Sequence, residues 1–127
     1  MRCLIVDDNL EFGLAARKLL EDGGIVVVGI ATSADDAIRD VEALEPDVAL
    51  LDINLGAESG FDVAKRLAEL RRVVERPAMI FISTDDGAEY ADLIEASPAV
   101  GFLHKTDLSA RTIHALLADG NEEMQPG

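Results

Sequence analysis

The sequence predicts an α/β protein built on a doubly wound parallel sheet, and two observations lead to this fold class. Short apolar runs alternate with stretches whose apolar residues recur at helical spacing, which is the pattern of repeated strand and helix units. Two of the apolar runs also end in aspartate, as expected where the carboxyl ends of parallel strands form a functional crevice. Five strands and five helices are therefore expected in strict alternation.

Each expected strand is a short apolar run, and the five runs cover residues 3 to 6, 25 to 31, 48 to 51, 78 to 83 and 99 to 103. The helices are marked by apolar residues three and four positions apart, within 12 to 20, 37 to 44, 61 to 70, 87 to 96 and 107 to 119. The fourth of these helices has the weakest pattern.

Glycine, serine and proline predict where the helices begin and end. The pair Gly23 and Gly24 is expected to end the first helix, and Ser33 or Ala34 to open the second. A proline stands just before each of the last three strands, where it stops the preceding helix: Pro46, Pro77 and Pro98.

Length and charge limit the classes of function. A chain of 127 residues is expected to form one domain over 1–119, followed at 120–127 by a flexible tail or the start of a linker. The formal net charge of −14 opposes direct contact with nucleic acid or anionic membranes, and no apolar stretch is long enough to span a bilayer. The single cysteine, Cys3, lies in the first apolar run and is expected to be a reduced core thiol, which favours a cytoplasmic location.

Three aspartates follow two of the expected strands. Asp7 and Asp8 follow the first strand and Asp52 follows the third, so their carboxylates are expected to converge at one edge of the sheet. Three converging carboxylates repel one another unless a cation neutralises them. A cluster of oxygen ligands suits a hard divalent ion, and Mg2+ is the first candidate.

Four stretches in fixed order carry a resemblance to a known family. They are LIVDDN at 4 to 9, DVALLDINL at 47 to 55, MIFIST at 79 to 84 and GFLHK at 101 to 105. With these motifs the chain resembles the receiver domains of two-component response regulators, from Arg2 to about Asp119. The resemblance implies the flavodoxin-like strand order 2-1-3-4-5, with the crevice at the ends of strands 1 and 3.

The resemblance also implies the roles of the residues in the crevice. Asp52 would be the phosphoacceptor, taking a phosphoryl group from a sensor histidine kinase. Asp7, Asp8 and Asp52 would hold Mg2+, with the backbone carbonyl of Asn54 as a further ligand. Lys105 would contact the phosphoryl oxygens as a point charge.

Three further residues match the positions through which the family responds to phosphorylation. Ser83 would contact the phosphoryl group through its hydroxyl, Thr84 is its larger-than-usual neighbour, and Phe102 matches an aromatic residue whose rotamer changes with the switch. Thr106 stands where many receivers have a proline after the lysine, so the loop must be held in another way.

The function expected from the resemblance is a switch that assists only its own phosphorylation and dephosphorylation, and is not otherwise an enzyme. An output domain or a separate protein would dock on helix 4, strand 5 and helix 5, the face that contains Tyr90, Phe102 and His104. Dimerisation on phosphorylation and the presence of a C-terminal output domain stay open.

Three alternatives remain. A degenerate receiver would dock without being phosphorylated. An aspartyl phosphatase would need a D-x-D motif after the first strand, where this chain has Asp7 and Asp8 side by side. A nucleotide or flavin module would need a glycine-rich or hydroxyl-rich loop there, and the loop is acidic.

Overall fold

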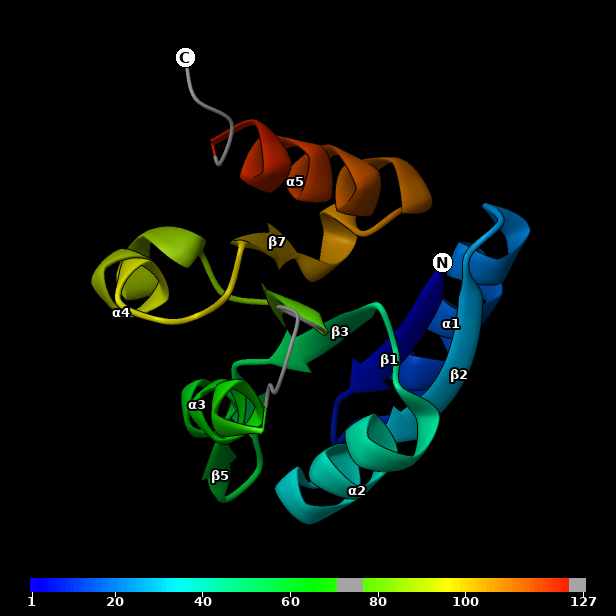
Figure 1. Cartoon of the computed structure of the whole chain (residues 1–127), viewed down its shortest axis with the longest axis horizontal. Coiled ribbons are helices and arrows are strands. Elements are labelled where there is room, and N and C mark those ends of the chain that lie inside the picture. The colour runs from blue at the N-terminus through cyan, green and yellow to red at the C-terminus, as the bar shows by residue number, and fades with distance from the viewer. Residues whose placement is uncertain (71–76, 124–127) are drawn as a thin grey trace.

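The computed structural model describes residues 1–70 and 77–123, with the side chains of 120–123 excepted. Its main sheet has five parallel strands in the order β2-β1-β3-β6-β7 (Figure 1). The strands are β1 Arg2–Val6, β2 Val26–Ala31, β3 Val48–Asp52, β6 Ala78–Ser83 and β7 Gly101–His104. This is the predicted order 2-1-3-4-5, since β4 and β5 form a separate pair.

Helices cover both faces of the sheet (Figure 1). They are α1 Leu10–Asp22, α2 Ala34–Leu44, α3 Gly60–Glu69, α4 Ala91–Glu95 and α5 Ala110–Glu123. Helices α1 and α5 pack on one face, while α2, α3 and α4 pack on the other. Among the described residues no helix is both long and apolar enough to cross a membrane.

Strand β1 shows why the sheet is buried on both faces. Cys3 and Ile5 contact the core under α1 and α5, whereas Leu4 and Val6 contact the core under α2 and α3. All four side chains are fully buried, as expected for a central strand of a parallel sheet. Burial raises the pKa of the Cys3 thiol to about 12, so this thiol stays protonated and unreactive.

Side-chain caps fix where the helices begin. Asn9, Ser33 and Ser59 precede α1, α2 and α3, and each accepts a hydrogen bond from a backbone N–H two or three residues further on. Of the two residues expected to open the second helix, Ser33 is the cap and Ala34 the first helical residue.

The largest differences from the sequence prediction concern the last two helices and one hairpin. The fourth helix is shorter, because Gly87–Tyr90 forms a 3-10 turn, η1, before α4. The fifth helix, α5, begins only at Ala110, because Lys105–Asp107 forms a second 3-10 turn, η2. At its other end α5 continues to Glu123, beyond the predicted boundary at 119. A small antiparallel hairpin, β4 Asn54–Leu55 and β5 Glu58–Ser59, was not predicted. Whether 120–127 acts as a tail or a linker stays a prediction.

Candidate metal centre at the carboxyl edge of the sheet

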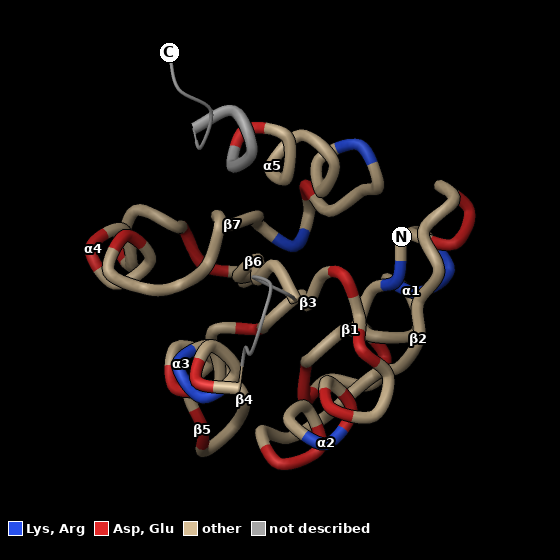
Figure 2. The backbone as a smooth tube through the Cα atoms, viewed as in Figure 1, with Lys and Arg blue, Asp and Glu red and all other residues tan. Residues whose placement is uncertain are grey.

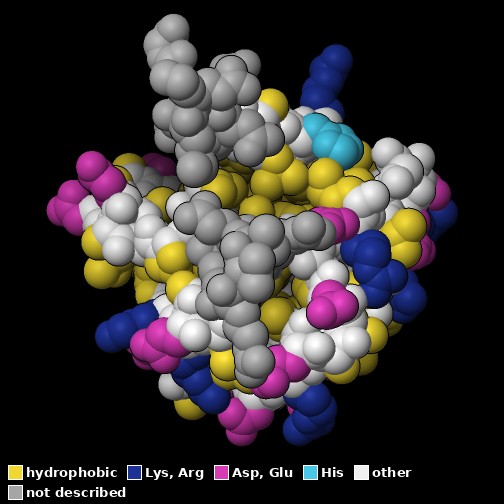
Figure 3. Space-filling model, in the orientation of Figure 1, with side chains coloured by type: hydrophobic (Ala, Val, Ile, Leu, Met, Phe, Trp, Pro, Cys, Tyr) yellow, Lys and Arg dark blue, Asp and Glu magenta, His cyan; other side chains and the backbone are white. Residues whose placement is uncertain are grey.

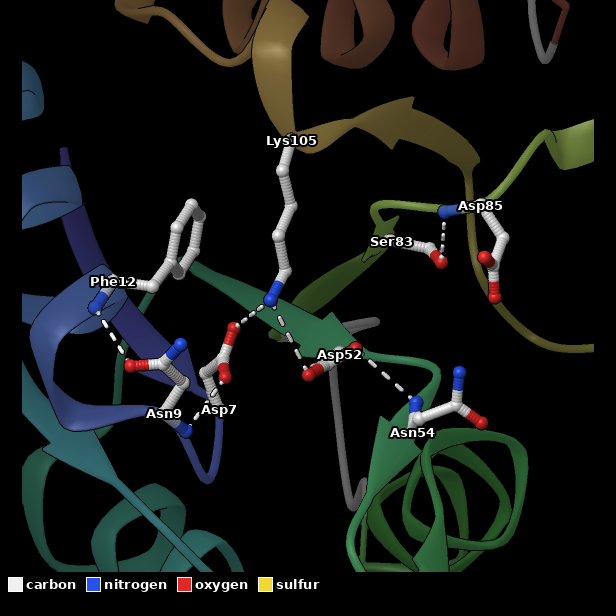
Figure 4. Close-up of polar contacts among 8 residues, drawn as sticks. All are labelled: Asp7, Asn9, Phe12, Asp52, Asn54, Ser83, Asp85 and Lys105. Atoms are coloured by element: carbon white, nitrogen blue, oxygen red, sulfur yellow. Dashed lines mark hydrogen bonds and ion pairs between the residues drawn. The ribbon is translucent and has the colours of Figure 1, made fainter.

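Three neighbouring strands end in the same kind of turn. Asp7 follows β1, Asp52 ends β3 and Ser83 ends β6, and the side chain of each accepts a hydrogen bond from a backbone N–H two residues on (Figure 4). The donors, at 2.9, 3.1 and 2.9 Å, are Asn9, Asn54 and Asp85. The turns hold the side chains at the sheet edge, and each aspartate keeps a second oxygen for other partners.

Lys105 joins the two buried aspartates from the far side of the crevice. Its Nζ lies 2.6 Å from Asp7 Oδ2 and 3.4 Å from Asp52 Oδ2 (Figure 4). The ammonium also lies 4.2 Å from the centroid of the Phe12 ring, a cation-π contact with α1. Asp7 and Asp52 are 0% and 6% exposed, so one ammonium serves two buried carboxylates.

The carboxylates fit a divalent cation. One oxygen from each of Asp7, Asp8 and Asp52 lies within 4.8 Å of the others. Asp7 Oδ2 is buried and makes an ion pair with Lys105, yet among residues 1–70 and 77–123 it has no hydrogen-bond donor. Three negative charges face one positive charge, and hard oxygen ligands of this kind suit Mg2+ or Ca2+.

Asp8 is the exposed member of this cluster. The cap of α1 is Asn9, whose side chain accepts from Phe12 N, so Asp8 is not the cap. Asp8 lies beside the β4–β5 turn. Its Oδ2 is so near Gly56 that a Cβ atom added there would lie 3.3 Å from it. Asn54 begins β4 two residues after Asp52, and the ligand role of its backbone carbonyl stays a prediction.

The environment of Asp52 disfavours its negative charge. Burial, followed by repulsion from Asp7, raises the pKa of the Asp52 carboxyl from 3.8 to about 6. The Asn54 backbone N–H and the Lys105 ammonium act in the opposite direction without cancelling the rise. The Asp52 carboxylate is still mostly ionised at neutral pH, and it is held in an unfavourable state that a nearby cation would relieve.

The remaining predicted residues lie at the end of β6 and in β7. Ser83 is buried and its hydroxyl is bonded to the Asp85 amide, whereas Thr84 is exposed. Phe102 is half-buried against η1, because a Cβ atom at Gly87 would lie 2.7 Å from its ring. In the described structure, ion pairs and hydrogen bonds link Lys105 to Asp7 and Asp52, while Ser83 and Phe102 take other partners.

Sequence reasoning missed a glycine that fixes the backbone of Asp52. A Cβ atom at Gly60 would lie 2.2 Å from the Asp52 carbonyl oxygen, so the first residue of α3 must lack a side chain. Gly60 N also donates to the Ile53 carbonyl oxygen at 2.8 Å. The only sequence signal was a glycine directly after the Ser59 cap.

Sequence reasoning also missed the contact of Phe12 with Lys105, because Phe12 was interpreted only as an apolar helix residue.

Comparisons with known proteins agree with this fold and site. The family model described as the response regulator receiver domain matches residues 3–118. A putative transcriptional regulator of Pseudomonas aeruginosa is 30% identical over 106 residues, covering 84% of this chain and 50% of that protein. A protein-glutamate methylesterase/protein-glutamine glutaminase of Halalkalibacterium halodurans is 33% identical over 109 residues, covering 83% of this chain and 30% of that protein.

A solved structure extends the comparison. The signal receiver domain of a modulated diguanylate cyclase from Desulfovibrio desulfuricans G20 is 30% identical, with a TM-score of 0.76 and coverage of 96% of this chain and 94% of that one. The fold and the acidic crevice thus define a flavodoxin-like signalling domain. The chain belongs to the response regulator receiver domain family. It spans half or less of the two curated relatives above.

The raised pKa of Asp52 predicts a pH dependence of stability. Between about pH 4 and 6 the folded state binds more protons than the unfolded state, so the free energy of unfolding falls as pH rises through this window. Without divalent ions, Asp52→Asn should therefore be more stable than wild type at pH 7.5, by on the order of 2 kcal/mol, and gain much less at pH 4. Urea unfolding in EDTA at both pH values measures this.

Asp119→Asn, which removes an exposed charge from α5, is the matched control and should show no such pH-dependent gain. Stability of Asp52→Asn at or below that of wild type at pH 7.5 would contradict the repulsion described.

The close contact at Gly60 predicts the effect of adding one methyl group. Gly60→Ala should lower the free energy of unfolding by roughly 1–3 kcal/mol, because the Cβ atom would displace the Asp52 backbone. Gly29→Ala is the control, since its Cβ atom would meet only ordinary contacts of 3.4 Å or more. Urea unfolding measures the free energy of unfolding of both variants. Equal stability of the two would contradict the prediction, because it would show that α3 shifts freely to admit the Cβ atom.

Proposed function

We propose that the chain is a phosphoacceptor switch in which Asp52 receives a phosphoryl group from the phosphohistidine of a sensor histidine kinase, with Mg2+ in the acidic crevice. One observation carries the proposal. Asp52 lies within the three-carboxylate cluster and 3.4 Å from the Lys105 ammonium, and it reaches solvent, whereas Asp7 shares the first two features but is fully buried. A phosphoryl group attached there would meet cations on two sides.

The chemistry follows from the two oxygens of Asp52. Oδ1 is held by the Asn54 amide, while Oδ2 faces Lys105 and is the oxygen assigned to attack phosphorus. The Oδ2–P bond forms as the N–P bond of the phosphohistidine breaks, and the imidazole leaves with the electron pair. Lys105 would pair with a phosphoryl oxygen, and Mg2+, when bound, would offset the charge of the others.

Three carboxylates and the backbone carbonyl of Asn54 are the proposed metal ligands. Asp7, Asp8 and Asp52 supply the oxygens that lie within 4.8 Å of one another. Mg2+ keeps several waters and needs few protein oxygens, so this set is chemically sufficient. Ca2+ accepts the same ligand type, and the size of the site would decide between them.

The proposed output face consists of η1, α4, β7 and α5. A hollow of about 470 Å3 lies there, with Phe102 and His104 in its lining together with Asp86, Gly87, Leu103 and Asp107. Ser83 and Thr84 lead directly into η1, so a movement of Ser83 toward a phosphoryl group would change this face. An attached output domain and a separate docking protein could both use it.

Charge supports a protein partner in preference to nucleic acid. The net charge is −14, and acidic residues are spread over α2, α4 and the connecting loops (Figure 2). On the face in Figure 3, Lys and Arg side chains are scattered among Asp and Glu and form no single basic patch. We propose that the domain works in the cytoplasm by protein docking, as a switch and not as an enzyme acting on other substrates.

The degenerate receiver is the second candidate, and the geometry favours it less. Asp7, Asp52 and Lys105 are in contact, and Asp8 completes the cluster. A domain used only for docking has no need to bury two carboxylates beside one ammonium, which costs folding free energy.

Phosphorylation at one residue is the direct test. With Mg2+ and acetyl phosphate, wild type should gain the mass of one phosphoryl group and Asp52→Asn should gain none, because a neutral amide takes the place of the nucleophilic carboxylate. Asp119→Asn should be labelled like wild type, and EDTA should prevent labelling. Intact-mass spectrometry reads all four samples; labelling of Asp52→Asn to the wild-type level would overturn the assignment.

A further inference from the structure

The side chain of His104 extends the pairing of β6 and β7 past the last backbone pair. His104 is the last residue of β7, and its register partner in β6 is Ser83. His104 Nε2 lies 2.7 Å from the carbonyl oxygen of Thr84, the residue that follows Ser83. The imidazole therefore ties the loop after β6 to the end of β7.

The other ring nitrogen of His104 holds the turn that contains Lys105. Thr106 N donates to His104 Nδ1 at 3.2 Å, and the Thr106 hydroxyl lies 2.8 Å from the same nitrogen. His104 thus caps η2, the 3-10 turn that begins with Lys105. This contact shows how the loop is held where Thr106 replaces the more usual proline.

These partners assign one tautomer to His104. A backbone N–H donates to Nδ1, so Nδ1 accepts and Nε2 carries the proton that is donated to the Thr84 carbonyl. The bond from Nε2 to the Thr84 carbonyl is the one that joins the loop after β6 to the end of β7.

We propose that His104 is a positioning residue for the phosphoryl transfer, whose ring keeps the Ser83 end of β6 and the Lys105 turn at a fixed separation. The inference rests on the proposed function, since Ser83 and Lys105 are the two groups assigned to contact the phosphoryl oxygens. In the part of the chain that the structure describes, His104 bonds to Thr84 and Thr106 and not to the carboxylates themselves. It acts through the two segments that it joins.

The charged neighbours of His104 lie mainly in the hollow on the output face. Asp86 and Asp107 line this hollow together with His104, and Lys105 is the next residue in the chain. Asp85, which follows Thr84, accepts a hydrogen bond from the Tyr90 hydroxyl at 3.2 Å. A partner that fills the hollow would touch the imidazole. Binding of a partner to the output face would therefore be linked through this side chain to the geometry of the phosphorylation site.

Three substitutions separate the two hydrogen-bonding roles. His104→Gln places an amide N–H donor where Nε2 stands, so it keeps the bond to the Thr84 carbonyl. His104→Asn places an acceptor where Nδ1 stands, so it keeps the η2 cap and loses the bridge. His104→Leu loses both. If positioning is the role, Gln rescues and Asn does not; if the residue is only a cap, Asn rescues and Gln does not.

The first readout is the rate of phosphorylation by acetyl phosphate at saturating Mg2+. His104→Leu and His104→Asn should slow labelling by roughly threefold to tenfold, while His104→Gln should stay close to wild type, because a misplaced catalytic group lowers the rate without preventing binding. Mg2+ affinity should be unchanged in all three. Equal rates in all variants, or rescue by Asn alone, would overturn the proposal.

Hydrogen exchange tests the bridge separately from phosphorylation. In the protein without phosphodonor, His104→Leu and His104→Asn should increase exchange at the Asp85 amide, which bonds to Ser83, and His104→Gln should not. If wild type were not phosphorylated at all, the proposed function would fail while this result still decided the bridge. Unchanged exchange in all variants would refute the bridge.

Discussion

The acidic crevice depends on an imbalance of charge, in which one ammonium faces three carboxylates. Asp7 and Asp52 are buried and share Lys105, and Asp8 adds a third negative charge from the rim. Burying carboxylates without full compensation costs free energy, which is why the pKa of Asp52 is raised to about 6. The fold stabilises a site that remains short of positive charge, and a bound divalent cation would supply the charge that Lys105 alone does not.

Two structural devices hold this unfavourable cluster in place. Turns formed by side chains at the ends of β1, β3 and β6 fix one oxygen of each site residue, and the second oxygens of Asp7 and Asp52 face Lys105. The packing of Gly60 against the Asp52 backbone fixes the end of β3 from the other side. Because strands β1, β3 and β6 are buried on both faces, the crevice cannot relieve its repulsion by moving apart without disturbing the core.

The sequence predicted the sheet and the charged cluster because both follow from parallel strands. The predicted strand at 78–83 agrees residue for residue with β6, and Asp7, Asp52 and Lys105 meet because the ends of parallel strands lie at one edge. The β4–β5 hairpin was missed because two-residue strands have no periodicity. The contacts of Gly60 and His104 were missed because both join segments distant in sequence through backbone atoms, which leave no pattern of residue types.

The most direct test of the charge imbalance is the free energy of unfolding of wild type and Asp8→Asn, measured in EDTA and in Mg2+. The account predicts that Asp8→Asn is more stable than wild type in EDTA, because one repelling charge is removed, and that Mg2+ stabilises it less. Asp119→Asn should gain from Mg2+ as wild type does. An Asp8→Asn protein that is less stable than wild type in EDTA, or that gains as much from Mg2+, would contradict the account.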